Sequence, residues 1–144
     1  MSTTFQTSDF QIAVPDGWRH RLVTTLFEGP AAPGQFQRSI VLTQDLLLAP
    51  CTAADFAAQQ RGDLLAVLPN VEVQDLPPLG TAAAPIPQLT LTWTPPDGSS
   101  IVQRQVFFVR APWAWTFTST TLKSDAGSLD DLFLRTVASF SPKP

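Results

Sequence analysis

The sequence has few of the residues from which most enzyme and metal sites are built. It has one cysteine, one histidine and no tyrosine among 144 residues. The lone Cys51 cannot form a disulfide within the chain. None of the residue spacings typical of metal, phosphate or nucleophile sites occurs. The sequence therefore predicts that the protein is not an enzyme and needs no cofactor.

Basic clusters and long apolar runs are also missing. The 9 Lys plus Arg are outnumbered by 12 Asp plus Glu, which argues against nucleic acid and anionic membrane surfaces as partners. The amino terminus lacks the basic start and apolar stretch of a secretory signal. Apolar stretches such as residues 46–51 are far shorter than the roughly 20 residues that span a bilayer. We expect one domain over residues 1–144, cytoplasmic and without stable membrane insertion.

Alternating residues and turn signals predict a mostly antiparallel sheet of five or more strands. An opening hairpin is expected from the alternation over Thr4–Val14 and the turn residues Pro15–Gly17. Asp97-Gly98 is a strong hairpin signal between two later strands. The Pro-rich residues 76–87 suit a loop or an irregular edge. Strands are expected over residues 20–28, 37–47, 71–75, 88–94, 100–110 and 114–122.

Two helices complete an α+β fold in which part of one sheet face is left without a helix. The first is predicted from Thr52 to about Leu68, because Thr52 and Asp55 have the spacing of a capping box. Gln60 lies in the middle of its apolar stripe. The second is predicted to begin at Ser128 as N-cap. Its apolar stripe comprises Leu129, Leu132, Phe133, Val137 and Phe140.

The predicted strands have one apolar face and a second face that is almost free of charge. The apolar face is expected to contain Ile40, Leu42, Leu89, Leu91, Trp93, Val106, Phe108, Trp115 and Phe117. The second is expected to contain Thr24, Leu26, Ser39, Val41, Thr43, Gln88, Thr90, Thr92, Ile101, Gln103, Gln105, Phe107, Thr116, Thr118 and Thr120. A solvated face would normally carry Lys and Glu. This second face therefore indicates a largely apolar partner that offers some hydrogen-bonding groups.

Several segments, in order along the chain, resemble the Eag chaperones. These are the effector-associated proteins of bacterial type VI secretion systems, within the wider DcrB-like and PsbP-like fold group. The resemblance rests on F-x-I-x-V-P-D-G-W at residues 10–18, the strand Gln37–Asp45 ending in Thr-Gln-Asp, the helix with Gln60, the pair Gln103 and Gln105, and Val137–Ser141.

The resemblance implies a curved antiparallel sheet backed by helices, and a chaperone function in the bacterial cytoplasm. Such proteins bind the amino-terminal transmembrane segments of a secreted effector, keep them out of the inner membrane and help load the effector onto the secretion spike. They act as homodimers. Carried onto this sequence, the contacts with the effector's transmembrane helix fall on Thr24, Leu26, Ser39, Val41, Thr43, Gln60, Leu68, Ile101, Gln103 and Gln105.

Two other functions are compatible with the same residues. A small-molecule or lipid carrier could use the uncharged face as one wall of a pocket, and a closed cavity of a few hundred Å³ would favour it. An open, shallow groove would favour a helix instead. A degenerate enzyme of a cone-shaped α+β fold would need an Asp or His inside the cavity, and the sequence places none there.

Overall fold

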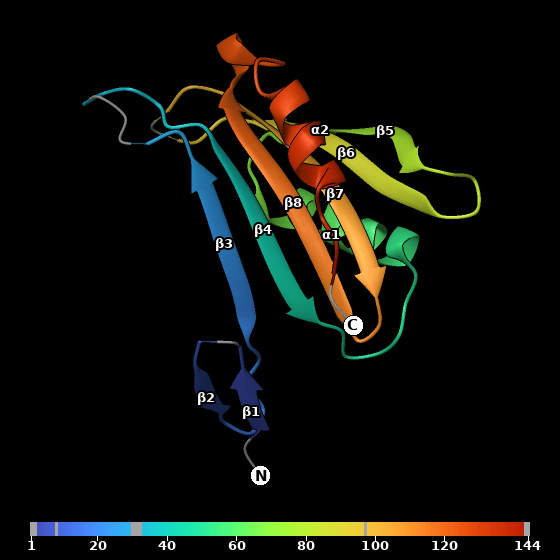
Figure 1. Ribbon diagram of the computed structural model, residues 1–144. Helices are drawn as coiled ribbons and strands as arrows, with labels where there is room; N and C mark the ends of the chain where they lie inside the picture. The colour runs from blue at the N-terminus through green and yellow to red at the C-terminus, as the bar shows by residue number, and fades with distance from the viewer. Residues whose placement is uncertain (1–2, 8, 30–32, 97, 143–144) are drawn as a thin grey trace.

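The protein is organised around a six-stranded antiparallel sheet (Figure 1). The computed structural model describes residues 3–7, 9–29, 33–96 and 98–142. In spatial order, the strands are β3 (Arg21–Phe27), β4 (Ser39–Leu46), β8 (Trp113–Leu122), β7 (Ile101–Arg110), β6 (Pro85–Trp93) and β5 (Glu72–Gly80). Each neighbouring pair is antiparallel. With a helix against each side of the sheet, this arrangement confirms the predicted α+β class.

A separate two-stranded sheet precedes β3. It consists of β1 (Thr3–Gln6) and β2 (Gln11–Val14). The predicted hairpin, with Thr4–Val14 as one strand and a turn at Pro15–Gly17, is wrong, because both strands of the observed hairpin lie before Pro15. The chain reverses between β1 and β2, where Thr7 Oγ1 accepts hydrogen bonds from the backbone N–H groups of Asp9 and Phe10 at 3.1 and 3.2 Å. Residues 15–17 instead turn the chain from β2 towards β3, with Gly17 at φ 78°.

Helix α1 (Ala53–Val67) begins where the capping box predicts. The Asp55 N–H donates to Thr52 Oγ1 at 3.1 Å, and the Thr52 N–H donates to the Asp55 carboxylate at 3.4 Å. The helix ends at Leu68, whose extended backbone suits the residue before a proline. Phe56 is buried against the sheet and forms a core with Leu89, Leu91, Phe107 and Ala114. These contacts hold α1 over β6 and β7.

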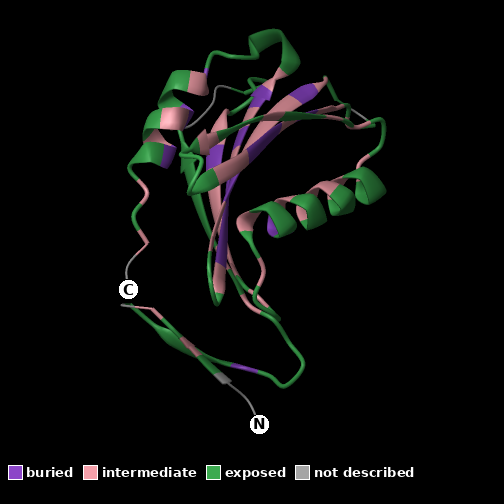
Figure 2. Cartoon of the chain, turned by 90° about the vertical axis from the view of Figure 1, so that its right-hand side faces the viewer, coloured by how far each residue is buried: buried purple, intermediate pink, exposed green. Residues whose placement is uncertain are grey.

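Helix α2 (Asp130–Ala138) covers the opposite side of the sheet, as Figure 2 shows. Leu129, Phe133 and Val137 are buried, and Phe133 is completely inaccessible. They pack on side chains from β4, β7 and β8, namely Ile40, Val106 and Phe117. Phe140, just beyond the helix, adds ring contacts to Phe108, Trp115 and Phe117. Each side of the sheet therefore has its own core.

The start of α2 differs from the prediction. The N-cap residue is Leu129, which makes no side-chain capping hydrogen bond, and a short 3-10 turn, η1 (Lys123–Asp125), comes before it. Ser128 does not cap the helix, because its Oγ accepts a hydrogen bond from Arg38 Nη1 at 2.9 Å. Leu132 was expected in the buried stripe but is 45% exposed.

Strand β5 continues through Pro77 and Pro78, so this part of the segment expected to form a loop or an irregular edge is an irregular edge. Its register with β6 shifts between Leu76 and Leu79, so the bulge contains Pro77 and Pro78. Prolines are tolerated there because β5 is an edge strand and its outer N–H groups have no partner to lose. Gln88 Nε2 donates to the Pro77 carbonyl at 2.7 Å and fixes the bulge to β6.

We expect Phe133→Ala to lower the free energy of unfolding by about 3–5 kcal/mol, because the side chain is fully buried and its loss leaves a cavity. The neighbouring Leu132→Ala is the matched control and should cost less than about 1 kcal/mol, because that side chain is largely in water. Urea unfolding followed by circular dichroism measures both. Equal losses would contradict the packing described here.

Candidate binding surface on the uncovered part of the sheet

The pairing register shows which residues share a face of the sheet. Directly paired residues in antiparallel strands project to the same side. Leu26 pairs with Ile40, whose side chain lies under α2. Leu89 pairs with Gln105, and Leu89 packs under α1. The side that α1 partly covers therefore includes Gln105, and the side that α2 covers includes Leu26.

On the α1 side, the surface of β3, β4 and β8 lies beyond the helix, which contacts β6 and β7. We call this surface, with the adjoining glutamines of β7, the open face. Val23 and Phe27 on β3 are 52% and 60% exposed, and their β4 neighbours are half-buried. The open face comprises Val23, Thr25, Phe27, Ser39, Val41, Thr43, Gln103, Gln105, Thr118 and Thr120. Thr116 projects to the same side but is buried.

Charge is confined to one end of this surface. The ion pair of Arg21 with Asp45, at 2.7 Å, lies where β3 begins. The described residues of the next three cross-strand rows have no charged side chain on the open face. These rows are Val23–Thr43–Thr116–Phe107, Thr25–Val41–Thr118–Gln105 and Phe27–Ser39–Thr120–Gln103. The surface thus offers apolar groups, hydroxyls and amides to a partner.

Two glutamine side chains border the open face. Gln103 Nε2 donates to Thr120 Oγ1 at 3.0 Å, and Gln105 Nε2 donates to Thr118 Oγ1 at 3.3 Å. Gln105 Oε1 is buried but accepts no hydrogen bond from the described residues. A buried acceptor without a donor costs about 1–3 kcal/mol.

The structure brings most of the sequence-predicted contact residues together on the α1 side. Ser39, Val41, Thr43, Gln103 and Gln105 lie on the open face. Ile101 is on the same side but is 92% buried, since only 8% of it is exposed.

The two helix residues among the predicted contacts also belong to the α1 side. Gln60 is half-buried, and it follows Phe56 by four residues and precedes Leu64 by four, so it shares their side of α1. Leu68, just beyond the helix, packs in the core beneath it.

Thr24 and Leu26 are on the wrong face for the predicted contact set. They project to the α2 side with Ile40 and Leu42, and β3 contributes Val23, Thr25 and Phe27 to the open face instead. Both faces of β3 have exposed apolar residues, so alternation alone does not choose between them. The pairing with β4 decides, and it depends on the length of the connecting loop.

The same ambiguity affects β6. Leu89, Leu91 and Trp93 were expected on the same face as Val106 and Phe117, but they lie on the α1 side. Their polar neighbours on β6 therefore lie on the α2 side, where Gln88 Oε1 accepts hydrogen bonds from Arg104 at 2.7 and 3.1 Å.

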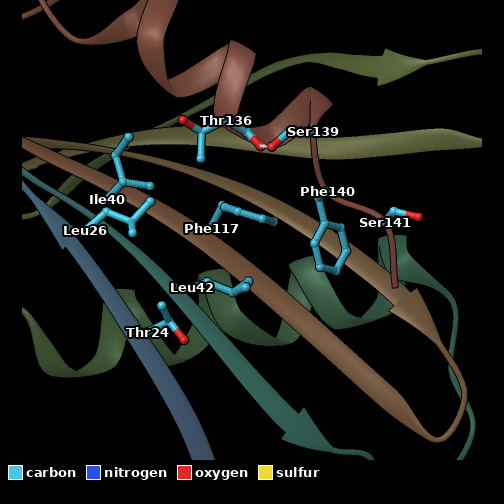
Figure 3. Close-up of a pocket in the computed structure, with 9 residues that line it drawn as sticks. All are labelled: Thr24, Leu26, Ile40, Leu42, Phe117, Thr136, Ser139, Phe140 and Ser141. Carbon is cyan, nitrogen blue, oxygen red and sulfur yellow. Dashed lines mark hydrogen bonds between the residues drawn. The ribbon is translucent and has the colours of Figure 1, made fainter. Parts of the chain in front are cut away.

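Thr24 and Leu26 line a hollow on the α2 side. Its volume is about 280 Å³, and it lies between β3, β4 and the end of α2, as Figure 3 shows. The lining consists of Thr24, Leu26, Ile40, Leu42, Phe117, Thr136, Ser139, Phe140 and Ser141. An adjoining hollow of about 230 Å³ shares Leu26, Ile40 and Thr136 with it.

The second hollow ends at a charged group. Arg38 forms an ion pair with Glu28, and its Nη1 lies 3.7 Å from Asp125. The hydrogen bond to Glu28 raises the pKa of the Arg38 guanidinium. The first hollow lies on the opposite side of the sheet from the open face, and the second borders the open face at Phe27 and Ser39.

Groups suited to catalysis are scattered. Within the described ranges, no three His, Cys, Asp or Glu side chains are placed to hold a metal ion. His20 lies at the base of the hairpin, with its ring centroid 4.3 Å from that of Phe5 and 6.0 Å from that of Trp113. Cys51 is half-buried beside the α1-side core. Of the helices described, none is long and apolar enough to cross a membrane.

Comparisons with known proteins agree with the resemblance noted in the sequence. The chain is 24% identical to Effector EagT6 of Pseudomonas aeruginosa over 145 aligned positions, covering 99% of this chain and 97% of that protein. No protein-family model matches the chain. The nearly full-length alignment confirms the resemblance to the Eag proteins.

Two solved structures are similar to the chain to different extents. One is the crystal structure of PA94 from Pseudomonas aeruginosa, a protein of unknown function, with a TM-score of 0.69 and 21% identity over 99% of this chain and 98% of that one. The other is the solution structure of cyanobacterial PsbP from Synechocystis sp. PCC 6803, with a TM-score of 0.45 and 13% identity over 99% and 92%. The first shows that the fold has been observed before.

We expect Gln105→Leu to leave the free energy of unfolding within about 0.5 kcal/mol of the unaltered chain, because loss of the 3.3 Å hydrogen bond from Nε2 to Thr118 is offset by removal of a buried acceptor that has no donor. Gln103→Leu is the matched control and should lower it by about 1 kcal/mol through loss of the bond to Thr120. Thermal unfolding of the two variants and of the unaltered chain measures these differences. A decrease of about 2 kcal/mol or more in the free energy of unfolding of Gln105→Leu would refute the assignment of Gln105 Oε1 as an acceptor without a donor.

Proposed function

We propose that this chain is a chaperone that binds and shields the amino-terminal transmembrane segments of a type VI secretion effector. It works in the bacterial cytoplasm and helps to load the effector onto the secretion spike. The observation that carries the proposal is the open face, a partly apolar β-surface whose middle rows have no charged side chain. The resemblance to the Eag chaperones, and the alignment with EagT6, support the same function.

The dimensions of the open face suit an apolar helix. A transmembrane helix of about 20 residues is about 30 Å long. Strand β4 has 8 residues, which is about 26 Å at 3.3 Å per residue. Val23, Phe27 and Val41 supply apolar area, and its burial contributes about 25 cal/mol per Å².

The polar groups of the open face suit the same partner. Membrane helices associate through small residues and side-chain hydrogen bonds rather than through ion pairs. Ser39 and Thr43 present hydroxyls, and the half-buried Gln105 adds an amide side chain at the border of the same surface. The surface therefore replaces some of the contacts that an apolar segment would find in a bilayer.

A carrier of small molecules or lipids has less support. The two hollows, of about 280 and 230 Å³, are at or below the lower end of the usual size for ligand pockets. The larger lies on the α2 side, away from the uncharged rows, and the smaller reaches those rows only at Phe27 and Ser39. The open face is a surface, which suits a helix better than a small ligand.

The proposed function requires a second copy of the chain. One sheet covers only one side of a bound helix and leaves the other in water. Two copies would bring two open faces to the effector's apolar segments. The proposed working unit is therefore a homodimer.

The test uses a soluble protein fused to an amino-terminal apolar segment of about 20 residues that is rich in Leu, Ala, Gly and Ser. Val41→Arg should weaken its co-purification, because a charge would be buried beneath the segment at a cost of at least about 2 kcal/mol, or about thirtyfold in Kd. Val41→Thr keeps the size without the charge and should retain binding.

Gln74→Arg adds the same charge on the exposed part of β5, far from the open face, and should also retain binding. Circular dichroism establishes that each variant is folded. Equal recovery of the fusion with Val41→Arg and the unaltered chain would refute the open face as the binding surface.

A further inference from the structure

The α2 side of the sheet is also only partly covered, because α2 packs on β4, β7 and β8 and leaves β3 beside it. The two hollows lie in the space between α2 and β3, and they adjoin, since Leu26, Ile40 and Thr136 line both. We call them together the α2 trough. It reaches the open face only at Phe27 and Ser39, so it is a second and largely separate surface.

Both walls and the floor of the α2 trough are apolar. Leu26 of β3 is 48% exposed and Leu132 of α2 is 45% exposed, and both line the smaller hollow. The floor of the larger hollow contains Ile40, Leu42 and Phe117. Helix α2 therefore has a wider apolar stripe than the sheet buries. Exposed apolar surface of this kind marks a site of interaction with a partner.

The shape of the α2 trough suits a helix lying beside α2. Helix α2 has 9 residues, which is about 13 Å at 1.5 Å per residue, so a partner helix of about 12 residues would run along all of it. Adjoining hollows can receive side chains from successive turns of one helix, at i, i+4 and i+7. An extended peptide would need free backbone groups on the floor, but β4 and β8 are paired on both edges.

The charges around the α2 trough differ between its two ends. Near the start of α2, Glu28 and Asp125 share the guanidinium of Arg38, and the side chains of both acids are 52% exposed. Further along α2, Arg135 is exposed and lies on the rim of the trough, three residues after Leu132. The α2 trough therefore attracts a cation at one end and an anion further along.

We propose that the α2 trough binds an amphipathic helix of a soluble partner protein, antiparallel to α2. Its apolar side chains occupy the two hollows, and a Lys or Arg at its carboxyl end faces Glu28. The direction follows from the helix dipole, since cations are favoured at the carboxyl end of a helix and anions at the amino end. An acidic side chain near the amino end then faces Arg135. This site goes beyond the proposed function, because it lies mainly on the other side of the sheet.

A transmembrane segment fits the α2 trough less well than a short amphipathic helix does. A membrane-spanning helix is about 30 Å long, more than twice the length of α2. Its middle also lacks the charged side chains that would pair with Glu28 and Arg135. The open face and the α2 trough are therefore suited to different partners.

An Ala-rich fluorescent peptide of about 15 residues serves as the probe. It has leucines at i, i+4 and i+7, Glu in its first turn and Lys in its last turn. Fluorescence anisotropy with the full chain should show saturable binding. Leu132→Glu should weaken it at least about tenfold, because a carboxylate would be buried beneath the peptide. Ala138→Glu makes the same kind of change on an exposed part of α2 that lines neither hollow, and it should retain binding.

A charge reversal tests the direction of the bound helix. Glu28→Lys should weaken binding of the probe about tenfold, because cations of the protein then face the lysines of the peptide. A second peptide, with Glu in place of those lysines, should bind Glu28→Lys more tightly than it binds the unaltered chain. Circular dichroism establishes that each variant is folded.

Two results would overturn the proposed helix site directly. One is that the unaltered chain does not bind the probe, and the other is that Leu132→Glu binds it as tightly as the unaltered chain does. Light scattering adds a third. If Leu132→Glu halved the mass of the protein in solution, the α2 trough would hold a second copy of the chain and not a partner helix.

The apolar fusion separates the α2 trough from the proposed function. Leu132→Glu should recover the fusion as the unaltered chain does, and Val41→Arg should still bind the peptide. Loss of both ligands in Leu132→Glu would make the trough part of the effector surface and overturn a separate partner. Peptide binding by an unaltered chain that does not recover the fusion would refute the proposed function and leave the α2 trough in place.

Discussion

The arrangement depends on a mismatch in width between helices and sheet. An α-helix with its side chains is about 10–12 Å across, and neighbouring strands are about 4.8 Å apart, so one helix covers little more than two strands. Each face of this six-stranded sheet has one helix within the described residues. Because Phe56 holds α1 over β6 and β7, the α1 side of β3, β4 and β8 is left without a helix. The proposed function uses that surface.

The composition of the open face reconciles two opposing requirements. For the proposed function, the surface has to be compatible with water while no partner is bound. It must also have a low free energy of desolvation when a partner binds. Hydroxyls and amides such as those of Thr43 and Gln103 are hydrated, but removing their water costs far less than removing the water around a charge. The ion pair of Arg21 and Asp45 stands at the end of the surface, where it can remain in solvent. Thr, Ser and Gln therefore serve reversible binding better than either leucine or lysine would.

Local signals in the sequence predict the helices and most strands well, because the interactions that define them are local. The capping box at Thr52 is an example, since both partners lie within three residues of each other. For the Pro-rich segment that includes the end of β5, the sequence left a loop and an irregular edge open, because a proline is acceptable in either and only the strand order shows that β5 is an edge. The hairpin turn was misplaced because two turn signals, at Thr7 and at Pro15, compete in one short segment.

Prediction from sequence patterns succeeds for only part of the candidate site. The sequence indicates an uncharged face and most of its members, such as Val41 and Gln105, because β4, β7 and β8 keep their alternation. It does not assign Thr24 and Leu26 correctly, because their face depends on pairing across a loop between β3 and β4. The missing interaction is non-local, and no pattern within β3 could have supplied it.

The prolines of β5 also limit how far such a sheet could grow. A chain with two receptive edges would add copies head to tail without end and produce fibres. Here Pro77 and Pro78 disrupt the β5 border, so β3 is the border left open to further strand pairing. The irregular strand therefore prevents open-ended growth of the sheet through both borders.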